Sequence, residues 1–210
     1  HWIATVLARR HGICANIWFP FPNAFFNWLF KKLVRELPEI SPFDPEKMTW
    51  DILRCLPDCL ETAAFAPLRA YLGDDSRDPG WGVKGLQLAN RIADTFDQYL
   101  LFRPEMVTGW ERGEGTHWQA MLWRRLMEGK DPLHRAALAR RFLSAVDDPK
   151  MTWEGLPERI AVFGISALPP YHMAILNGLS HVMAVNLFVM NPCREFWGDI
   201  LPDREQVRRS

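Results

Sequence analysis

One stretch of the chain carries the side-chain types that hydrogen-bond to nucleobases. Regularly spaced apolar residues predict a helix over residues 87–101. Carboxylates accept from the cytosine amine, Gln serves either edge of adenine, and Arg pairs with guanine or phosphate, so an exposed array of these types could read bases. The alternative is a solvated polar face, which the spacing also allows. The polar faces of this stretch carry Arg91, Asp94, Thr95, Asp97 and Gln98, and Arg103 follows the stretch, just before Pro104.

Aromatic residues near the beginning of the chain offer a second kind of nucleic-acid contact. Phe21 lies close in sequence to Trp18, Phe25 and Trp28. Aromatic rings stack on single-stranded bases without reading their sequence. The alternative is that most of these rings pack in a core.

No catalytic motif is complete. The glycine-rich stretch at residues 78–85 lacks the GK[ST] of a phosphate-binding loop, so we interpret it as part of a surface loop over residues 73–85. Residues 164–168, GISAL, match the hydrolase elbow GxSxG except at the last position. We therefore expect no catalytic residue in this chain, and a tight turn at Gly164 and Ser166.

Metal sites and disulfides are not expected either. Cys55 and Cys59 are four residues apart, but no second Cys or His pair accompanies them, as a zinc site would require. The other two cysteines are scattered, the histidines occur singly, and no carboxylates cluster. Few cysteines also favour a reducing compartment, so we expect a cytoplasmic protein.

Charge and hydropathy narrow the class of protein. The 25 basic and 25 acidic residues cancel, which argues against a strongly basic nucleic-acid binder but permits a local basic path. No apolar run approaches the length of a membrane span, and no signal peptide is seen. The chain opens in the middle of a helical pattern without Met, so we expect a fragment of a longer protein.

The last third reads as strand, helix, strand, at residues 160–165, 171–179 and 182–190. Nearly continuous apolar runs around a helix predict parallel strands buried on both faces. In nucleotide-hydrolysing α/β domains such a strand ends in acidic residues that hold Mg²⁺. Here it ends without a carboxylate, so the scaffold of an ATPase is expected without its chemistry.

Three regions follow along the chain. Residues 1–23 form a helix and an extended piece at 13–19, which we assign to an α/β core; residues 24–157 are a large helical insertion; residues 158–210 continue the core. The predicted fold class is therefore α/β, a parallel sheet interrupted by a helical subdomain. Superfamily 1 helicases are built in this way.

Three groups of strings in this sequence are specific enough to compare with a known family. The first is GICANI with FPFP, at residues 12–17 and 19–22. The second is ADTFDQYL with FRP, at residues 93–100 and 102–104. The third is FGISALPP, NPCR and FWGD, at residues 163–170, 191–194 and 196–199. Together these strings resemble the RecC family, the gamma subunits of bacterial exodeoxyribonuclease V. The resemblance runs through nearly the whole chain in the family's order.

The resemblance implies an inactive superfamily 1 helicase-like domain in a non-catalytic subunit of a helicase–nuclease that repairs double-strand breaks by recombination. Such a subunit guides single-stranded and forked DNA and scans one strand for the Chi sequence. Its implied partners are the beta (helicase–nuclease) and alpha (helicase) subunits, which use the ATP and Mg²⁺; no cofactor is implied in this chain. The implied location is the nucleoid-associated cytoplasm.

Carried over residue by residue, the resemblance implies DNA contacts at eight positions. Asn27 stands where an aromatic is expected and Thr95 where an aliphatic residue is expected, so the recognised sequence would differ from the family's or be absent. Two other functions stay open: an ATP-dependent helicase whose phosphate loop lies outside this sequence, and a scaffold for partner subunits. The eight residues are Phe21, Asn27, Asp94, Thr95, Asp97, Gln98, Arg103 and Arg135.

Overall fold

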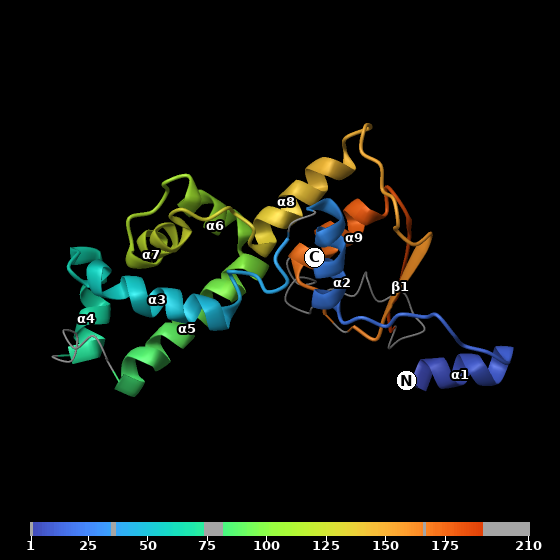
Figure 1. Ribbon diagram of the computed structural model, residues 1–210, viewed down its shortest axis with the longest axis horizontal. Coiled ribbons are helices and arrows are strands. Elements are labelled where there is room, and N and C mark those ends of the chain that lie inside the picture. The colour runs from blue at the N-terminus through green and yellow to red at the C-terminus, as the bar shows by residue number, and fades with distance from the viewer. Residues whose placement is uncertain (1, 35–36, 74–81, 166, 191–210) are drawn as a thin grey trace, which may run out of the picture.

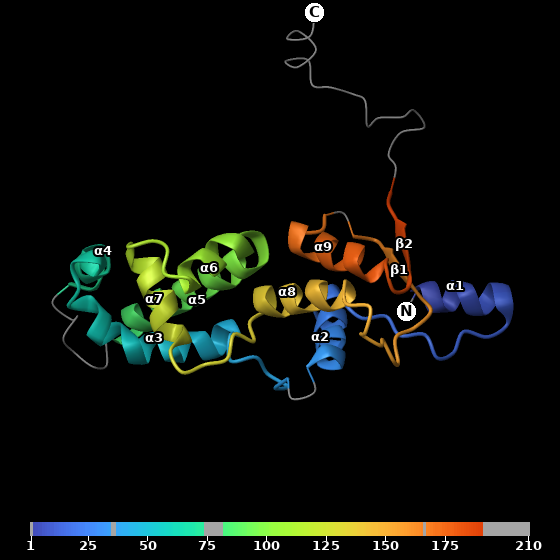
Figure 2. The ribbon, with the colours of Figure 1, turned by 90° about the horizontal axis from the view of Figure 1, so that it is seen from above.

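Two lobes lie end to end along the long axis of the molecule (Figure 1, Figure 2). The computed structural model describes residues 2–34, 37–73, 82–165 and 167–190. The helical lobe contains α3 (Pro45–Leu60), η1 (Ala63–Phe65), α4 (Ala66–Leu72), α5 (Gly82–Phe102), α6 (Pro104–Glu111) and α7 (Trp118–Met127). The sheet lobe contains α2 (Pro22–Leu33), α8 (Arg135–Val146), β1 (Arg159–Phe163), α9 (Pro170–Leu179) and β2 (Ala184–Phe188). At the far end beyond the sheet lobe lies α1 (Trp2–His11), none of whose residues is buried.

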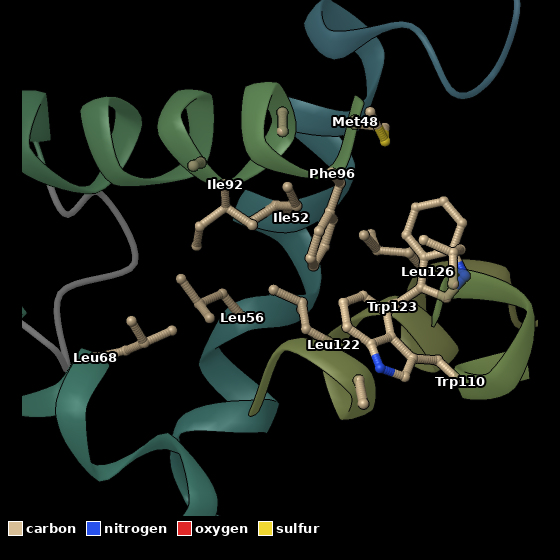
Figure 3. Close-up of a cluster of buried hydrophobic side chains, with 14 of the residues drawn as sticks. Met48, Ile52, Leu56, Leu68, Ile92, Phe96, Trp110, Leu122, Trp123 and Leu126 are labelled. Atoms are coloured by element: carbon tan, nitrogen blue, oxygen red, sulfur yellow. The ribbon is translucent and has the colours of Figure 1, made fainter. Parts of the chain in front are cut away.

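The core of the helical lobe forms where α3 packs against both α5 and α7 (Figure 3). Ile52 of α3, Phe96 of α5 and Trp123 of α7 are buried there, and the Phe96 and Trp123 rings meet edge to face with centroids 5.4 Å apart. Edge-to-face pairs add to the free energy gained by burying apolar area. The predicted apolar stripe of residues 87–101 is confirmed as the buried face of α5.

A separate core holds the sheet lobe together. It is formed by the apolar faces of α2, α8 and α9, with half-buried side chains of both strands packed against it. The close approach of α8 and α9 depends on Gly178, because a Cβ there would lie 2.8 Å from Cδ2 of Leu143 and 3.2 Å from Cε1 of Phe142. The C-terminal part of α5 contacts both α8 and α9, so this one helix reaches both lobes.

The predicted strand–helix–strand unit is confirmed. The strands β1 and β2 pair in parallel, with Arg159 opposite Ala184, and α9 connects them. Gly164 after β1 has φ of 69°, a left-handed conformation that favours glycine and makes the turn at that position. The prediction that both faces of the strands are buried is wrong: Ala161 and Phe163 are exposed, because α9 covers only the alternate side chains.

The extended piece predicted at residues 13–19 is not a strand. Asn16 adopts φ of 57°, which breaks an extended run, and Pro20 and Pro22 lack the N–H that a ladder needs. Among the described residues the sheet therefore has two strands, both from the last third of the chain. The first region supplies a helix and an irregular connection instead.

The fold is mixed α/β, with many helices and a small parallel sheet. Most of the predicted insertion, residues 24–157, forms the helical lobe, while α2 and α8 pack in the sheet lobe. The division into three regions stays a prediction. Within the described part of the chain, no helix is both long and apolar enough to cross a membrane. Some of the positions discussed above lie outside the described residues. These are the strings at 191–194 and 196–199, the loop residues 74–81, and Ser166.

Candidate nucleic-acid interface

The exposed face of α5 presents Asp94 and Gln98 to solvent. Among the described residues, no hydrogen bond or ion pair engages either side chain, so both are available to a ligand. Thr95 lies beside them, half-buried, and its hydroxyl donates to the carbonyl of Arg91 at 2.7 Å. That hydroxyl can still accept a hydrogen bond. Of the polar residues that the sequence predicted as an array, the carboxylate of Asp94 and the amide of Gln98 are therefore exposed and without a hydrogen-bond partner among the described residues.

Asp97 lies one turn after Asp94 on α5 and pairs with Arg135, the first residue of α8. Nη2 of Arg135 lies 2.8 Å from Oδ1 of Asp97, and the two side chains are 27% and 16% exposed. Burial raises the pKa of Asp97, with Asp44 and Asp94 adding to the rise, while the Arg135 charge opposes it. The predicted base reader and the predicted phosphate contact are therefore partners of each other.

Arg135 also lines a cavity of about 170 Å³ between α2, α8 and α9. Asn27, exposed on α2, lines the same cavity, so the structure brings these two predicted residues together. Lys31 adds a second positive charge to the lining. The Tyr171 hydroxyl donates to the Arg135 carbonyl at 2.9 Å, which fixes the start of α8 against α9.

His172 is a polar lining residue that the sequence did not single out. It is 6% exposed, and neither ring nitrogen has a hydrogen-bond partner among the described residues. Its ring stacks on Phe26 with centroids 4.6 Å apart. Burial, and then the Arg135 charge, lower the pKa of His172, so the neutral ring is favoured. A single His in an apolar run gives no signal of this position, because it depends on how α9 packs against α2.

The remaining predicted residues, Phe21 and Arg103, each precede a helix. Phe21 comes before α2 and is 86% exposed, as a stacking platform requires. The rings of Trp18, Phe25 and Trp28 lie 5.6–6.3 Å apart. Phe25 and Trp28 pack against the sheet-lobe core, which favours the packing alternative for these two, whereas Trp18 is 56% exposed. Arg103 is exposed before α6, and no side-chain contact in the described ranges engages it.

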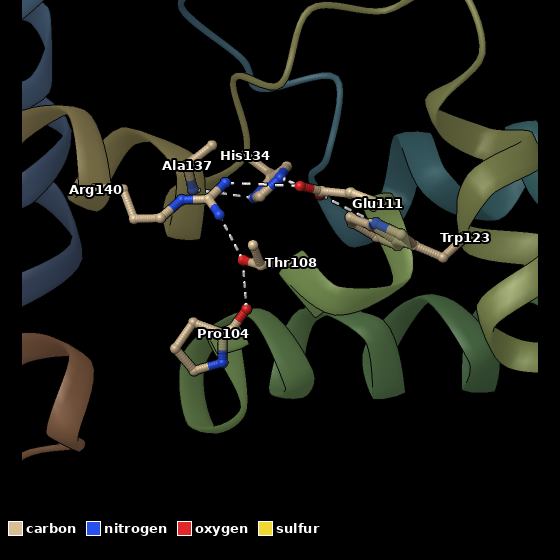
Figure 4. Close-up of polar contacts among 7 residues, drawn as sticks. All are labelled: Pro104, Thr108, Glu111, Trp123, His134, Ala137 and Arg140. Atoms are coloured by element: carbon tan, nitrogen blue, oxygen red, sulfur yellow. Dashed lines mark hydrogen bonds and ion pairs between the residues drawn. The ribbon is translucent and has the colours of Figure 1, made fainter. Parts of the chain in front are cut away.

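A buried network fixes the start of α8, where Arg135 lies (Figure 4). Nδ1 of His134 accepts from the Ala137 amide at 3.2 Å and so caps the helix. Nε2 of the same ring lies 2.7 Å from Oε1 of Glu111, which also accepts from Nε1 of Trp123 at 3.2 Å. Burial raises the pKa of Glu111, but these two hydrogen bonds and the charge of Arg140 outweigh it and lower the pKa.

Chemically, the surface combines a free carboxylate and amide on α5, the free guanidinium of Arg103, and an ion pair next to a polar cavity. Such groups can bind phosphate and base edges. Across the described residues, no three potential metal-ligating side chains come together.

Comparison with known proteins identifies the family. The family described as "RecC, N-terminal domain" matches residues 1–210. The RecBCD enzyme subunit RecC of Escherichia coli (strain K12) is 39% identical over 95% of this chain, and that of Haemophilus influenzae is 36% identical over all of it. The subunit from Mycolicibacterium smegmatis is 25% identical over 98% of the chain. The chain spans 18–21% of the length of these relatives. The predicted resemblance is confirmed, and the chain belongs to the RecC N-terminal domain family.

Proposed function

We propose that this chain is the N-terminal, non-catalytic DNA-binding part of a RecC-type subunit in a helicase–nuclease that acts in double-strand break repair by recombination. The observation that carries the proposal is the surface around α5. Asp94, Gln98 and Arg103 are exposed and free of protein partners in the described ranges, in a chain of the RecC N-terminal domain family. The proposed partners are single-stranded and forked DNA and the two other subunits, which use the ATP and Mg²⁺. The proposed location is the nucleoid-associated cytoplasm.

The proposal includes an inactive superfamily 1 helicase-like core. The parallel unit β1–α9–β2 supports it, as does the turn at Gly164, where the strand ends without a carboxylate to hold Mg²⁺. The helical lobe precedes this unit in the chain, as an insertion between parts of a core would.

In the proposed mechanism, single-stranded DNA moved by the partner subunits passes across α5. Asp94 and Gln98 meet base edges, and Arg103 meets phosphate. Arg135 takes part only when its pair with Asp97 opens toward the DNA. A Chi-like sequence is then held longer than other sequences, and about 1.4 kcal/mol of added affinity lengthens the hold tenfold.

The test uses the full-length subunit, reconstituted with its partners. We would map cleavage of linear duplex DNA, with and without Chi, for a Gln98→Ala/Arg103→Ala double variant. Both side chains are exposed and make no hydrogen bond or ion pair with described residues, so the fold is expected to survive. The expected result is normal unwinding with a lost response to Chi.

The matched control is Arg112→Ala/Glu114→Ala, which removes an exposed ion pair at the other end of α6. It is expected to respond to Chi like the wild type. If the Gln98→Ala/Arg103→Ala variant also responds normally, the sequence-reading role is wrong.

The exposed Trp18, Phe19 and Phe21 favour a second candidate, a scaffold for partner subunits. Ultraviolet crosslinking in the complex separates the two functions. Crosslinks from DNA to residues 94–103 support the first function, and their absence with intact assembly supports the scaffold. ATP hydrolysis by the isolated full-length subunit would instead support the helicase alternative.

A further inference from the structure

Two thiols share one face of α3 in its last turns. Cys55 and Cys59 are four residues apart, and residues at this spacing are neighbours on a helix surface. Both are free and half-buried at the edge of the helical-lobe core. Sγ of Cys55 lies 3.6 Å from the Ile52 carbonyl oxygen.

The surroundings lower the pKa of the Cys59 thiol. The hydrogen bond from Cys55 is the main cause that lowers the pKa of Cys59, and the charge of Arg125 on α7 adds to it; burial, Asp58 and Glu128 oppose it. The same hydrogen bond, together with burial and the charge of Cys59, raises the pKa of Cys55. The charge of the Arg125 guanidinium therefore acts on both thiols.

The helix spacing decides what can join the two sulfurs. Cβ atoms at this spacing lie about 5–6 Å apart, whereas a disulfide needs about 3.5–4.5 Å. A bridging metal adds two bonds of about 2.3 Å each and so spans the larger distance without unwinding the helix. Zinc would require four ligands, and the described residues bring no third ligand to this pair. Soft thiolates select Cu(I).

We propose that Cys55 and Cys59 bind one soft monovalent cation of the Cu(I) class between their sulfur atoms. Both thiols release their protons to solvent as two metal–sulfur bonds form, and the metal keeps its oxidation state. The resulting bis-thiolate carries one negative charge, which Arg125 faces. The site lies on α3 and α7, so it is independent of the proposed DNA-binding role.

The bound cation would also clamp a weak turn of α3. Pro57 lies inside this helix between the two cysteines and has no N–H to donate to the Leu53 carbonyl. A sulfur–metal–sulfur bridge spans that same turn. Binding is therefore expected to raise the Tm of the protein.

The test is a titration of the reduced full-length subunit with Cu(I), under anaerobic conditions and in competition with a chromogenic Cu(I) chelator. The expected result is one tight equivalent fewer in Cys55→Ser and in Cys59→Ser than in the wild type. The matched control is Cys14→Ser, which removes a lone half-buried thiol and is expected to keep the wild-type stoichiometry. Arg125→Gln is expected to keep the stoichiometry and weaken binding by about tenfold or less.

A melting curve gives a second measurement. Cu(I) is expected to raise the Tm of the wild type and of Cys14→Ser, but not of Cys59→Ser or Cys59→Ala. Melting without copper shows whether the variants fold. Equal stoichiometry in wild type and both cysteine variants would overturn the proposal, as would an intact Tm response in Cys59→Ser, or formation of a Cys55–Cys59 disulfide in place of binding.

Discussion

Glu111 is the residue on which the junction of α6, α7 and α8 depends. One of its oxygens accepts from both His134 and Trp123, whose side chains are fully buried. Because Nδ1 of His134 accepts the Ala137 amide, the ring proton lies on Nε2 and points to Glu111. The other oxygen lies 3.6 Å from Nη2 of Arg140. A single carboxylate therefore satisfies two buried donors and helps to fix the start of the helix that carries Arg135.

The substitution Glu111→Leu is expected to lower the free energy of unfolding by about 2–4 kcal/mol, because two buried donors lose their acceptor. Glu111→Gln keeps an acceptor oxygen and is expected to cost less. Urea unfolding monitored by tryptophan fluorescence measures both changes. Glu105→Leu, at an exposed position of the same helix, is the control and is expected to leave the midpoint nearly unchanged. Equal midpoints for Glu111→Leu and the control would contradict this account.

The lowered pKa of Glu111 also predicts a pH dependence. The folded-state pKa lies below the ordinary value of 4.5, so the ionised carboxylate stabilises the fold. This contribution is fully present above about pH 4.5 and is lost as the pH falls through the folded-state pKa. The difference in unfolding free energy between wild type and Glu111→Gln is therefore expected to shrink from pH 7 to pH 3. A difference that stays constant would show that the charge of Glu111 contributes nothing.

At the scale of elements, the packing of α8 on α9 is set by the missing side chain of Gly178. Gly178→Val is expected to destabilise the protein by about 1–3 kcal/mol, because its methyl groups would meet Phe142 and Leu143. Asn177→Val, exposed on the same helix, is the control for the lower helix propensity of Val. Leu143→Ala in the Gly178→Val background is expected to recover part of the loss. Chemical denaturation of the wild type, Gly178→Val, Leu143→Ala and the double variant measures this coupling, and strict additivity would exclude the close contact.

The elements that sequence alone predicted are those whose signals are local. The β1–α9–β2 unit was predicted because apolar runs, Gly164 and the prolines mark its boundaries. The strand expected at residues 13–19 failed because an apolar run becomes a strand only when another strand pairs with it. The pairing of Asp97 with Arg135 was not predicted, since it depends on the rotation of α5 relative to α8. For the same reason, no pattern in the sequence pointed to His172.

At the scale of the whole molecule, the balance of 25 basic and 25 acidic residues leaves no net charge to attract DNA. Any attraction must come from positive charges that acidic neighbours do not cancel. Arg103 is such a charge within the described residues, whereas Arg135 is paired with Asp97. The resemblance implies DNA contacts at both arginines, but only the charge of Arg103 is free to attract phosphate.

This difference can be measured through the salt dependence of single-stranded DNA binding by the full-length subunit. Each phosphate contact adds about 0.7 to the slope of log K against log salt concentration for single strands. Arg103→Ala is expected to reduce the slope by about that amount. Arg135→Ala is expected to reduce it less, because in the wild type its charge is already balanced by Asp97. Arg112→Ala, which removes an arginine paired with Glu114, is the control and is expected to keep the wild-type slope.

If Arg135→Ala lowers the slope as much as Arg103→Ala, the ion pair opens on DNA binding and Arg135 meets phosphate directly. If neither changes it, the DNA path lies away from α5.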